Sequence, residues 1–125
     1  MATTVTVWTL PVLSQEFRDW PIAKIERSGF TLSFDAETSS GEYVWSHLTF
    51  ENTLAVRFTG HTACQEDQFD AYDQLVDVTD SAWRRDVENA SGLRGLRHFR
   101  IYFDDVGCFD IVGSDFFYSG STNSP

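Results

Sequence analysis

One stretch constrains the fold of this chain more than any other: residues 96–112, with the sequence LRHFRIYFDDVGCFDIV. Apolar and polar side chains alternate from residue 98 to residue 103, as is typical of a half-buried strand. The segment Asp105-Val106-Gly107 predicts a three-residue hairpin loop, because glycine accepts the positive φ of the last loop position. This loop sets four cross-strand pairs: Phe103 with Phe109, Ile101 with Ile111, Tyr102 with Asp110, and Arg100 with Val112. The predicted core residues are Phe99, Ile101, Phe103, Phe109 and Ile111.

The length of 125 residues predicts one globular domain, over residues 1–118. The last seven residues, 119–125, contain only Ser, Gly, Thr, Asn and Pro, and we expect a flexible tail there. Nineteen acidic residues against nine basic ones give a net charge of −10, which argues against a nucleic-acid partner. A basic protein suits this charge better, although the charge could also serve solubility alone.

The N-terminus, MATTVTVWTL, shows neither a cationic start nor a continuous apolar run, and no stretch approaches the length of a membrane helix. We therefore expect a cytoplasmic protein without a membrane partner. In that compartment Cys64 and Cys108 are expected to be reduced thiols.

The remaining chain predicts further strands, most of them in hairpins. Residues 3–10 predict an edge strand that ends at Pro11. Residues 23–27 and 30–35 flank a Ser28-Gly29 turn, which would place Ile25 opposite Leu32 and Ala23 opposite Phe34. Thr31, Ser33 and Asp35 would then face outward.

Residues 43–50 and 54–60 predict a second hairpin with residues 51–53 as its loop. In this hairpin His47 would face Arg57, and Tyr43 would face His61. Residues 75–78 have a strand composition, and Asp80 is the predicted N-cap of a helix over residues 81–89 that ends at Ser91-Gly92. The predicted fold class is α+β and β-rich: an antiparallel sheet or curled half-barrel of about seven strands built from successive hairpins, with the helix packed on or beside it.

The outward faces of these hairpins supply the first candidate site. If the hairpins share one sheet, their polar and aromatic side chains converge as in a ligand pocket. The candidate pocket residues are Tyr43, Trp45, His47, Arg57, His61, His98, Arg100, Tyr102 and Asp110. The alternative is that this face packs under the helix, with Trp83 filling it and the His and Arg groups at the rim.

A zinc site is a weaker hypothesis. His61 and Cys64 form one close pair that Cys108 or His98 could complete, but structural zinc sites need four ligands, often in two close pairs. We predict no metal and no cofactor. The sequence also contains no Gly-x-Ser-x-Gly, no phosphate-binding glycine loop and no His-Glu-x-x-His, so we predict no catalytic residues.

The acidic run HTACQEDQFDAYD, residues 61–73, supplies the third candidate. Its predicted partner-binding residues are Glu66, Asp67, Phe69, Asp70, Tyr72 and Asp73. Asp104 and Asp105 add two carboxylates at the hairpin tip. A solvated or turn-forming role is the alternative for all these acids.

The sequence thus favours a small acidic, non-enzymatic domain that docks a basic protein partner in a regulatory or neutralising role. Acidic residues would attract the partner, and aromatic anchors such as Trp45, Phe69 or Tyr72 would hold it. The first alternative is a small-ligand-binding β-barrel, or an enzyme built on one, that uses Arg57, His98, Arg100 and Tyr102. A homodimer formed through an exposed strand edge is the second.

Overall fold

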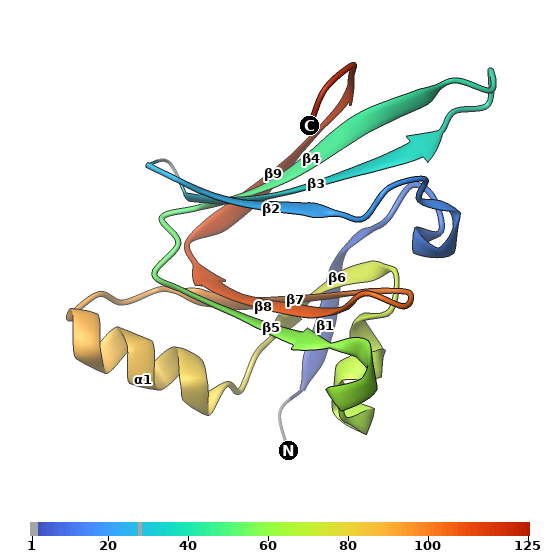
Figure 1. Cartoon of the computed structure of the whole chain (residues 1–125). Coiled ribbons are helices and arrows are strands. Elements are labelled where there is room, and N and C mark those ends of the chain that lie inside the picture. Colours follow the sequence, from blue (N-terminus) through green and yellow to red (C-terminus); the bar gives the residue numbers. More distant parts are fainter. Residues whose placement is uncertain (1–2, 28) are drawn as a thin grey trace.

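The computed structural model describes residues 3–27 and 29–125. It confirms the α+β, β-rich fold, in which antiparallel strands predominate and an α-helix lies beside them (Figure 1). The strands are β1 (Thr4–Thr9), β2 (Ile22–Glu26), β3 (Gly29–Glu37), β4 (Tyr43–Glu51), β5 (Ala55–Gly60), β6 (Gln74–Val78), β7 (Arg97–Phe103), β8 (Gly107–Gly113) and β9 (Asp115–Thr122). The helices are α1 (Ala82–Ser91) and the 3-10 helices η1 (Ser14–Glu16), η2 (His61–Ala63) and η3 (Glu66–Ala71).

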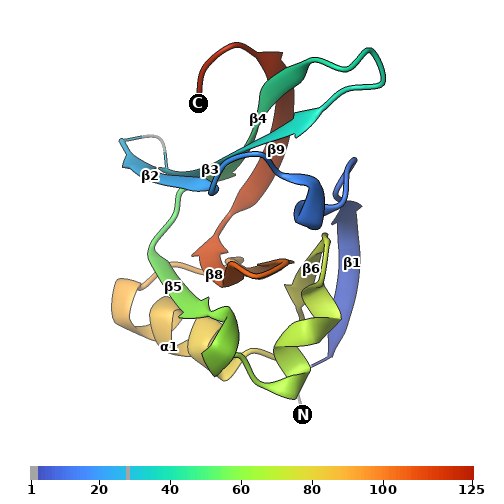
Figure 2. The same ribbon diagram turned by 45° about the vertical axis from the view of Figure 1, so that its right-hand side comes forward.

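The strands of the described ranges form two stacked sheets instead of the single sheet of about seven strands that the sequence predicts. The five-stranded sheet has the order β1-β6-β7-β8-β5, and the four-stranded sheet has the order β2-β3-β4-β9. The edge position predicted for the first strand is confirmed, because β1 pairs only with β6. Figure 2 shows α1 and the η2–η3 segment beneath the five-stranded sheet, on the side away from the other sheet.

The core lies between the two sheets. It is rich in phenylalanine, which the alternating strands direct inward from both sides. All five predicted core residues, Phe99, Ile101, Phe103, Phe109 and Ile111, belong to this cluster. The four-stranded sheet adds the inward-facing Phe30, Leu32, Phe34, Leu48 and Phe50.

The predicted register of the β7–β8 hairpin is wrong by two residues. Ile101 lies opposite Phe109 and Arg100 opposite Asp110, whereas Phe103 lies opposite Gly107. The loop comprises residues 104–106, and Asp105 has a φ of 58° there. Gly107, with a φ of 136°, is needed for a different reason: a Cβ on it would lie 2.1 Å from the carbonyl oxygen of Thr59 on β5. Because the shift is even, every side chain keeps its predicted face.

The β2–β3 hairpin shows the same error. Ile25 lies opposite Phe30 and Ala23 opposite Leu32, instead of the predicted Leu32 and Phe34. The last observed pair joins Glu26 to Gly29, so the turn begins one residue earlier than predicted. Ser28, one of the two predicted turn residues, lies outside the described residues.

The second predicted hairpin does not exist, because β4 and β5 belong to different sheets. His47 lies opposite Ser33 and Ser119, and Arg57 lies opposite Asp110. The predicted pairs of His47 with Arg57 and of Tyr43 with His61 are therefore wrong. The chain crosses between the sheets at residues 52–54 (Figure 1), where the Leu54 N–H donates to the carbonyl of Val112 at 2.8 Å.

Three residues predicted to face solvent on β3 are buried. Thr31 and Ser33 bond to Thr49 and His47 of β4, and the Asp35 carboxylate accepts from Arg18 Nε at 2.9 Å and from the Asp19 N–H at 2.8 Å. These contacts come from segments that are distant in sequence, so alternation along β3 alone could not predict them.

Helix α1 begins one residue later than predicted. Its N-cap is Ser81, whose Oγ accepts from the Arg84 N–H at 3.0 Å, whereas Asp80 forms an exposed ion pair with Arg85. Gly92 ends the helix with a φ of 77°, as predicted. At the other end of the chain, β9 runs to Thr122, four residues into the range predicted as a tail.

Candidate functional site

The nine predicted pocket residues do not converge on one surface. Five lie on the outer face of the five-stranded sheet: Arg57, His98, Arg100, Tyr102 and Asp110. Three others, Tyr43, Trp45 and His47, belong to β4 in the other sheet, and His61 begins η2. The pocket prediction assumed that both hairpins share a sheet, and the crossing between β4 and β5 separates them.

A buried polar network occupies the outer face of the five-stranded sheet. Asp110 is at its centre: one carboxylate oxygen, Oδ1, lies 2.7 Å from Arg100 Nε and 2.6 Å from His98 Nε2. All three residues are buried. An ionised carboxylate only accepts hydrogen bonds, so both nitrogens donate to it. Burial disfavours the charge of Asp110, but the bonds from His98 and Arg100 and the positive charge of Arg100 outweigh it and hold the pKa below its ordinary value.

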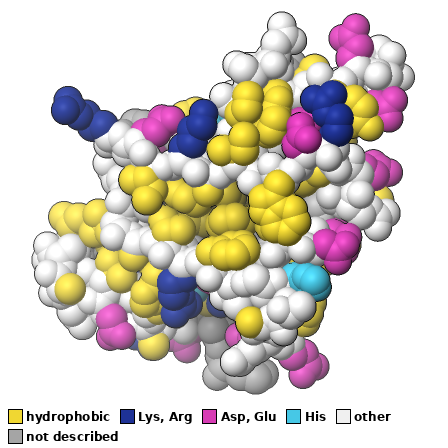
Figure 3. Space-filling model, in the orientation of Figure 1, with side chains coloured by type: hydrophobic (Ala, Val, Ile, Leu, Met, Phe, Trp, Pro, Cys, Tyr) yellow, Lys and Arg dark blue, Asp and Glu magenta, His cyan; other side chains and the backbone are white. Residues whose placement is uncertain are grey.

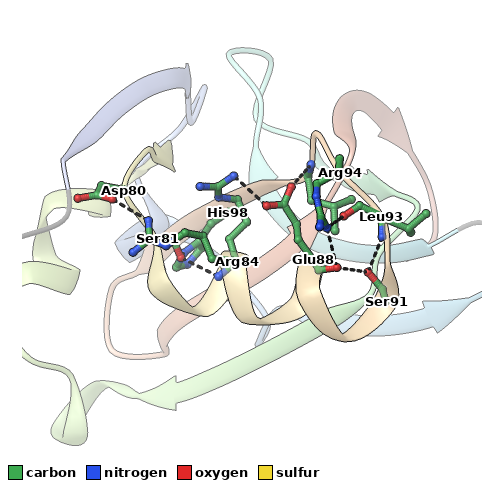
Figure 4. Close-up of polar contacts among 10 residues, drawn as sticks. Asp80, Ser81, Arg84, Glu88, Ser91, Leu93, Arg94 and His98 are labelled. Carbon is green, nitrogen blue, oxygen red and sulfur yellow. Dashed lines mark hydrogen bonds and ion pairs between the residues drawn. The ribbon is translucent and has the colours of Figure 1, made fainter.

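The network continues into helix α1 through Ser81 (Figure 4). His98 Nδ1 lies 2.6 Å from Ser81 Oγ, which also accepts the N-cap bond from Arg84. The order serine, histidine, aspartate resembles a hydrolytic triad. However, Ser81 is only 4% exposed and its Oγ caps the helix. The arrangement thus ties the helix to the sheet and presents no accessible nucleophile.

Trp83 covers the His98 end of this network, on the side away from the sheet. Its ring meets the His98 ring edge to face at 5.1 Å, and the Arg57 guanidinium lies 4.0 Å from the Trp83 ring centre. The alternative in which the helix covers the candidate face holds in part: Trp83 covers His98, but the segment around η3 covers Tyr102, and His98 and Arg100 are buried within the face instead of lying at its rim. Sequence analysis missed Ser81 as a partner of His98. Its only sequence signal is a serine directly before a helical pattern, which predicts a cap but not a histidine contact.

Cys108 lies on the same face beside Asp110, and Cys64 packs against the cluster that contains Cys108 and Tyr102. Burial raises the pKa of the Cys108 thiol, and the charge of Asp110 raises it further. Burial also raises the pKa of Cys64, whose Sγ lies 3.4 Å from the Thr59 carbonyl oxygen. Among residues 3–27 and 29–125, no three His, Cys, Asp or Glu side chains are grouped to hold a metal ion.

On the four-stranded sheet the candidate residues have structural partners. His47 bridges Ser33 and Thr122, with 2.8 Å from Nδ1 to Ser33 Oγ and 2.8 Å from Nε2 to Thr122 Oγ1. Burial, and then the charge of Lys24, lower the pKa of His47. Trp45 is buried, so it is not available as the docking anchor that the sequence suggested.

The predicted partner-binding residues form a surface around η3. Gln65 and Gln68 make a reciprocal capping box that fixes the start of this short helix. The side chains of Phe69 and Tyr72, on and directly after this helix, are 48% and 39% exposed. Both rings pack on Tyr102, with centroid distances of 5.0 and 5.7 Å.

The fold brings the acidic run next to the tip of the β7–β8 hairpin. The Tyr72 hydroxyl donates to Asp104 Oδ1 at 2.7 Å, and this bond strongly raises the pKa of Tyr72. Asp73 does not belong to this surface, because it is half-buried and bonds to Ser14. We define the acidic surface as the other five predicted partner-binding residues together with the two acids of the hairpin tip: Glu66, Asp67, Phe69, Asp70, Tyr72, Asp104 and Asp105.

Comparisons with protein-family models, with curated proteins and with solved structures found no match to this chain. None of the described helices is long and apolar enough to cross a membrane.

Proposed function

We propose that this protein is a non-enzymatic binding module that docks the basic surface of a protein partner on its acidic surface. The observation that carries the proposal is the placement of two exposed aromatic rings among five carboxylates. Carboxylates at a surface speed encounter with a basic protein, and aromatic side chains are common anchors of interfaces. The two features occur together on η3 and the neighbouring hairpin tip.

Most carboxylates of the acidic surface have no basic partner in the described part of the chain, in contrast to the paired acids of the sheets and of helix α1. Asp35, Asp77, Glu88 and Asp110 each pair with an arginine. Within the described ranges, no basic group lies within 4.0 Å of the carboxylates of Glu66, Asp70, Asp104 or Asp105, and Asp67 lies 3.8 Å from Arg100 Nη1. Much of the negative charge at this surface is therefore available to a partner.

The aromatic rings are held in place before any partner arrives. Phe69 and Tyr72 both rest on the buried Tyr102, and Tyr72 is further fixed by Asp104. Side chains that are already ordered lose little conformational entropy on binding. This favours them as anchors over flexible surface residues.

The experiment is capture from a lysate of the source organism at low salt, with the wild-type chain and two charge-reversal variants immobilised in parallel. Glu66→Lys with Asp70→Lys alters the acidic surface and spares Asp67, which faces Arg100. Glu37→Lys with Glu42→Lys is the matched control, because it changes the net charge equally in the exposed β3–β4 loop region.

A partner held by the wild type and the control, but lost from the Glu66/Asp70 variant and released at high salt, would support the proposal. With that partner purified, the Glu66/Asp70 variant should associate more slowly and with a weaker dependence on salt. Equal losses from both variants would indicate binding through net charge alone and would refute docking at this surface.

A further inference from the structure

A groove opens at the end of the molecule opposite the acidic surface. It has a volume of about 660 Å³ and lies where the β2–β3 turn, the β4–β5 crossing and the loop between α1 and β7 meet. Ile25, Leu54 and Leu93 line it and are 87%, 42% and 49% exposed. Figure 3 shows apolar side chains gathered along this face, between the edges of the two sheets. Its volume falls within the range typical of small-molecule sites.

One wall of the groove is the crossing between β4 and β5, and hydrogen bonds fix it. The Leu54 N–H donates to Val112, the Ser114 N–H donates to Glu51, and Asn52 Nδ2 donates to Ser114 Oγ at 2.9 Å. Gly113 lies so close that a Cβ on it would be 2.8 Å from the Glu51 carbonyl oxygen. This wall is therefore formed without a ligand.

The opposite wall is the loop after helix α1, and the buried Glu88 organises it (Figure 4). Glu88 Oε2 accepts from the Leu96 N–H at 3.0 Å, and Oε1 accepts from Arg84 Nη1 at 3.3 Å. The Glu88 carbonyl accepts from Arg94 Nη1 at 3.1 Å, and the same nitrogen donates to the Leu93 carbonyl at 2.9 Å. These bonds hold the Arg94 side chain at the groove.

The charges lining the groove oppose those of the whole protein. Arg27 and Arg94 line it together with one acid, Glu26, so its formal charge is +1 (two arginines minus one glutamate), in a chain of net charge −10. An arginine binds a carboxylate through paired N–H donors. The apolar walls in turn suit a hydrocarbon chain.

We propose that this groove binds a free monocarboxylate with an apolar body of medium length, such as a fatty acid. The carboxylate is bound by Arg94 with Arg27, and the hydrocarbon chain lies against Ile25, Leu54 and Leu93. This site is separate from the acidic surface, so neither proposal depends on the other.

The test uses decanoate as the probe and decyltrimethylammonium as a cation of equal chain length. Calorimetric titration of the full chain should show saturable 1:1 binding of decanoate at concentrations up to about 1 mM. Amide chemical shifts of the wild type should change at residues 25–27, 29–30, 52–56 and 93–96 and stay fixed at residues 66–72. This mapping needs no variant and so does not depend on one that folds.

Two charge-reversal variants test the role of Arg94 in decanoate binding. Arg94→Glu should weaken decanoate binding roughly ten-fold or more, because a charge-assisted bond is lost and a repulsive charge gained. Arg85→Glu is the matched control: it makes the same charge change on the exposed side of α1, and decanoate should bind it as it binds the wild type.

Three binding results would each overturn the proposal, in addition to the vesicle result below: no saturable binding of decanoate, equal binding of decyltrimethylammonium, or equal affinity of the Arg94→Glu variant and the wild type. Co-sedimentation with neutral phosphatidylcholine vesicles in the absence of decanoate would instead identify the groove as a membrane contact. That outcome would also exclude the free acid as its natural occupant.

Discussion

Two charged regions lie side by side beneath the five-stranded sheet, and they differ in what surrounds their carboxylates. In the buried network, Asp110 has Arg100 and His98 within 2.7 Å and is itself almost completely buried. On the acidic surface, Glu66 and Asp70 are exposed to solvent. The first arrangement stabilises the fold, because its charges already have partners. The second leaves charges available to another molecule. Whether a charged side chain already has a partner within the protein is therefore more informative about its role than the amino-acid type is.

The strongest test of this contrast is Asp110→Asn. The substitution keeps the shape of the side chain but leaves Arg100 buried without its counter-charge, and we expect a loss of about 3 kcal/mol in the free energy of unfolding. Urea denaturation measures it. Asp70→Asn is the control and should change stability by less than about 0.5 kcal/mol. Similar small losses in both variants would show that the network is not the stabilising element.

The pH dependence of stability should follow the same carboxylate. The pKa of Asp110 is lower in the folded protein than in the unfolded chain, so the unfolded chain binds more protons in acid. The contribution of Asp110 is complete above the unfolded-state value of about 4 and is lost as the pH falls below it. The unfolding free energies of the wild type and the Asp110→Asn variant should therefore begin to converge as the pH falls below about 4. A constant difference between them would contradict this assignment.

Ser81→Ala should have a smaller effect, of about 1–2 kcal/mol, because it removes the N-cap of α1 and the contact with His98. Ser81→Thr retains the hydroxyl and should lose less. Thermal unfolding followed by circular dichroism would measure both variants. If Ser81→Ala were as stable as the wild type, the link between helix and sheet would contribute nothing to stability.

The smallest expected effect concerns the acidic surface. Tyr72→Phe removes the bond to Asp104, which is exposed to solvent, so stability should fall by about 0.5 kcal/mol or less. The high-pH absorbance titration should also lose one late-titrating tyrosine, because this bond strongly raises the pKa of Tyr72. A loss as large as that of Ser81→Ala would mean that the acidic surface is part of the structural network.

Sequence reasoning recovered which way side chains point better than it recovered their neighbours. Phe99, Ile101 and Phe103 lie in the core as predicted, although the predicted register of their hairpin is wrong by two residues. Alternation has a period of two, so a shift of two residues leaves every face unchanged. Only the loop conformation distinguishes the two registers, and here Asp105 takes the positive φ within the loop.

The candidate sites show the same limit. Glu66, Phe69, Asp70 and Tyr72 are close in sequence, so their common surface could be predicted. Ser81, His98 and Asp110 meet only because the helix folds back onto β7 and β8. The groove combines residues 25–27, 29–30, 52–56, 93–94 and 96, which no local pattern connects.

The position of β9 has a consequence for synthesis of the protein. This strand pairs with β4, about seventy residues earlier in the chain, and its Phe116 packs on Phe99 across the core. Contacts so distant in sequence form slowly, because a long loop must close first. The four-stranded sheet therefore cannot be completed until β9 has left the ribosome. Until then, β4 exposes an unpaired edge to which a chaperone or a second nascent chain could bind.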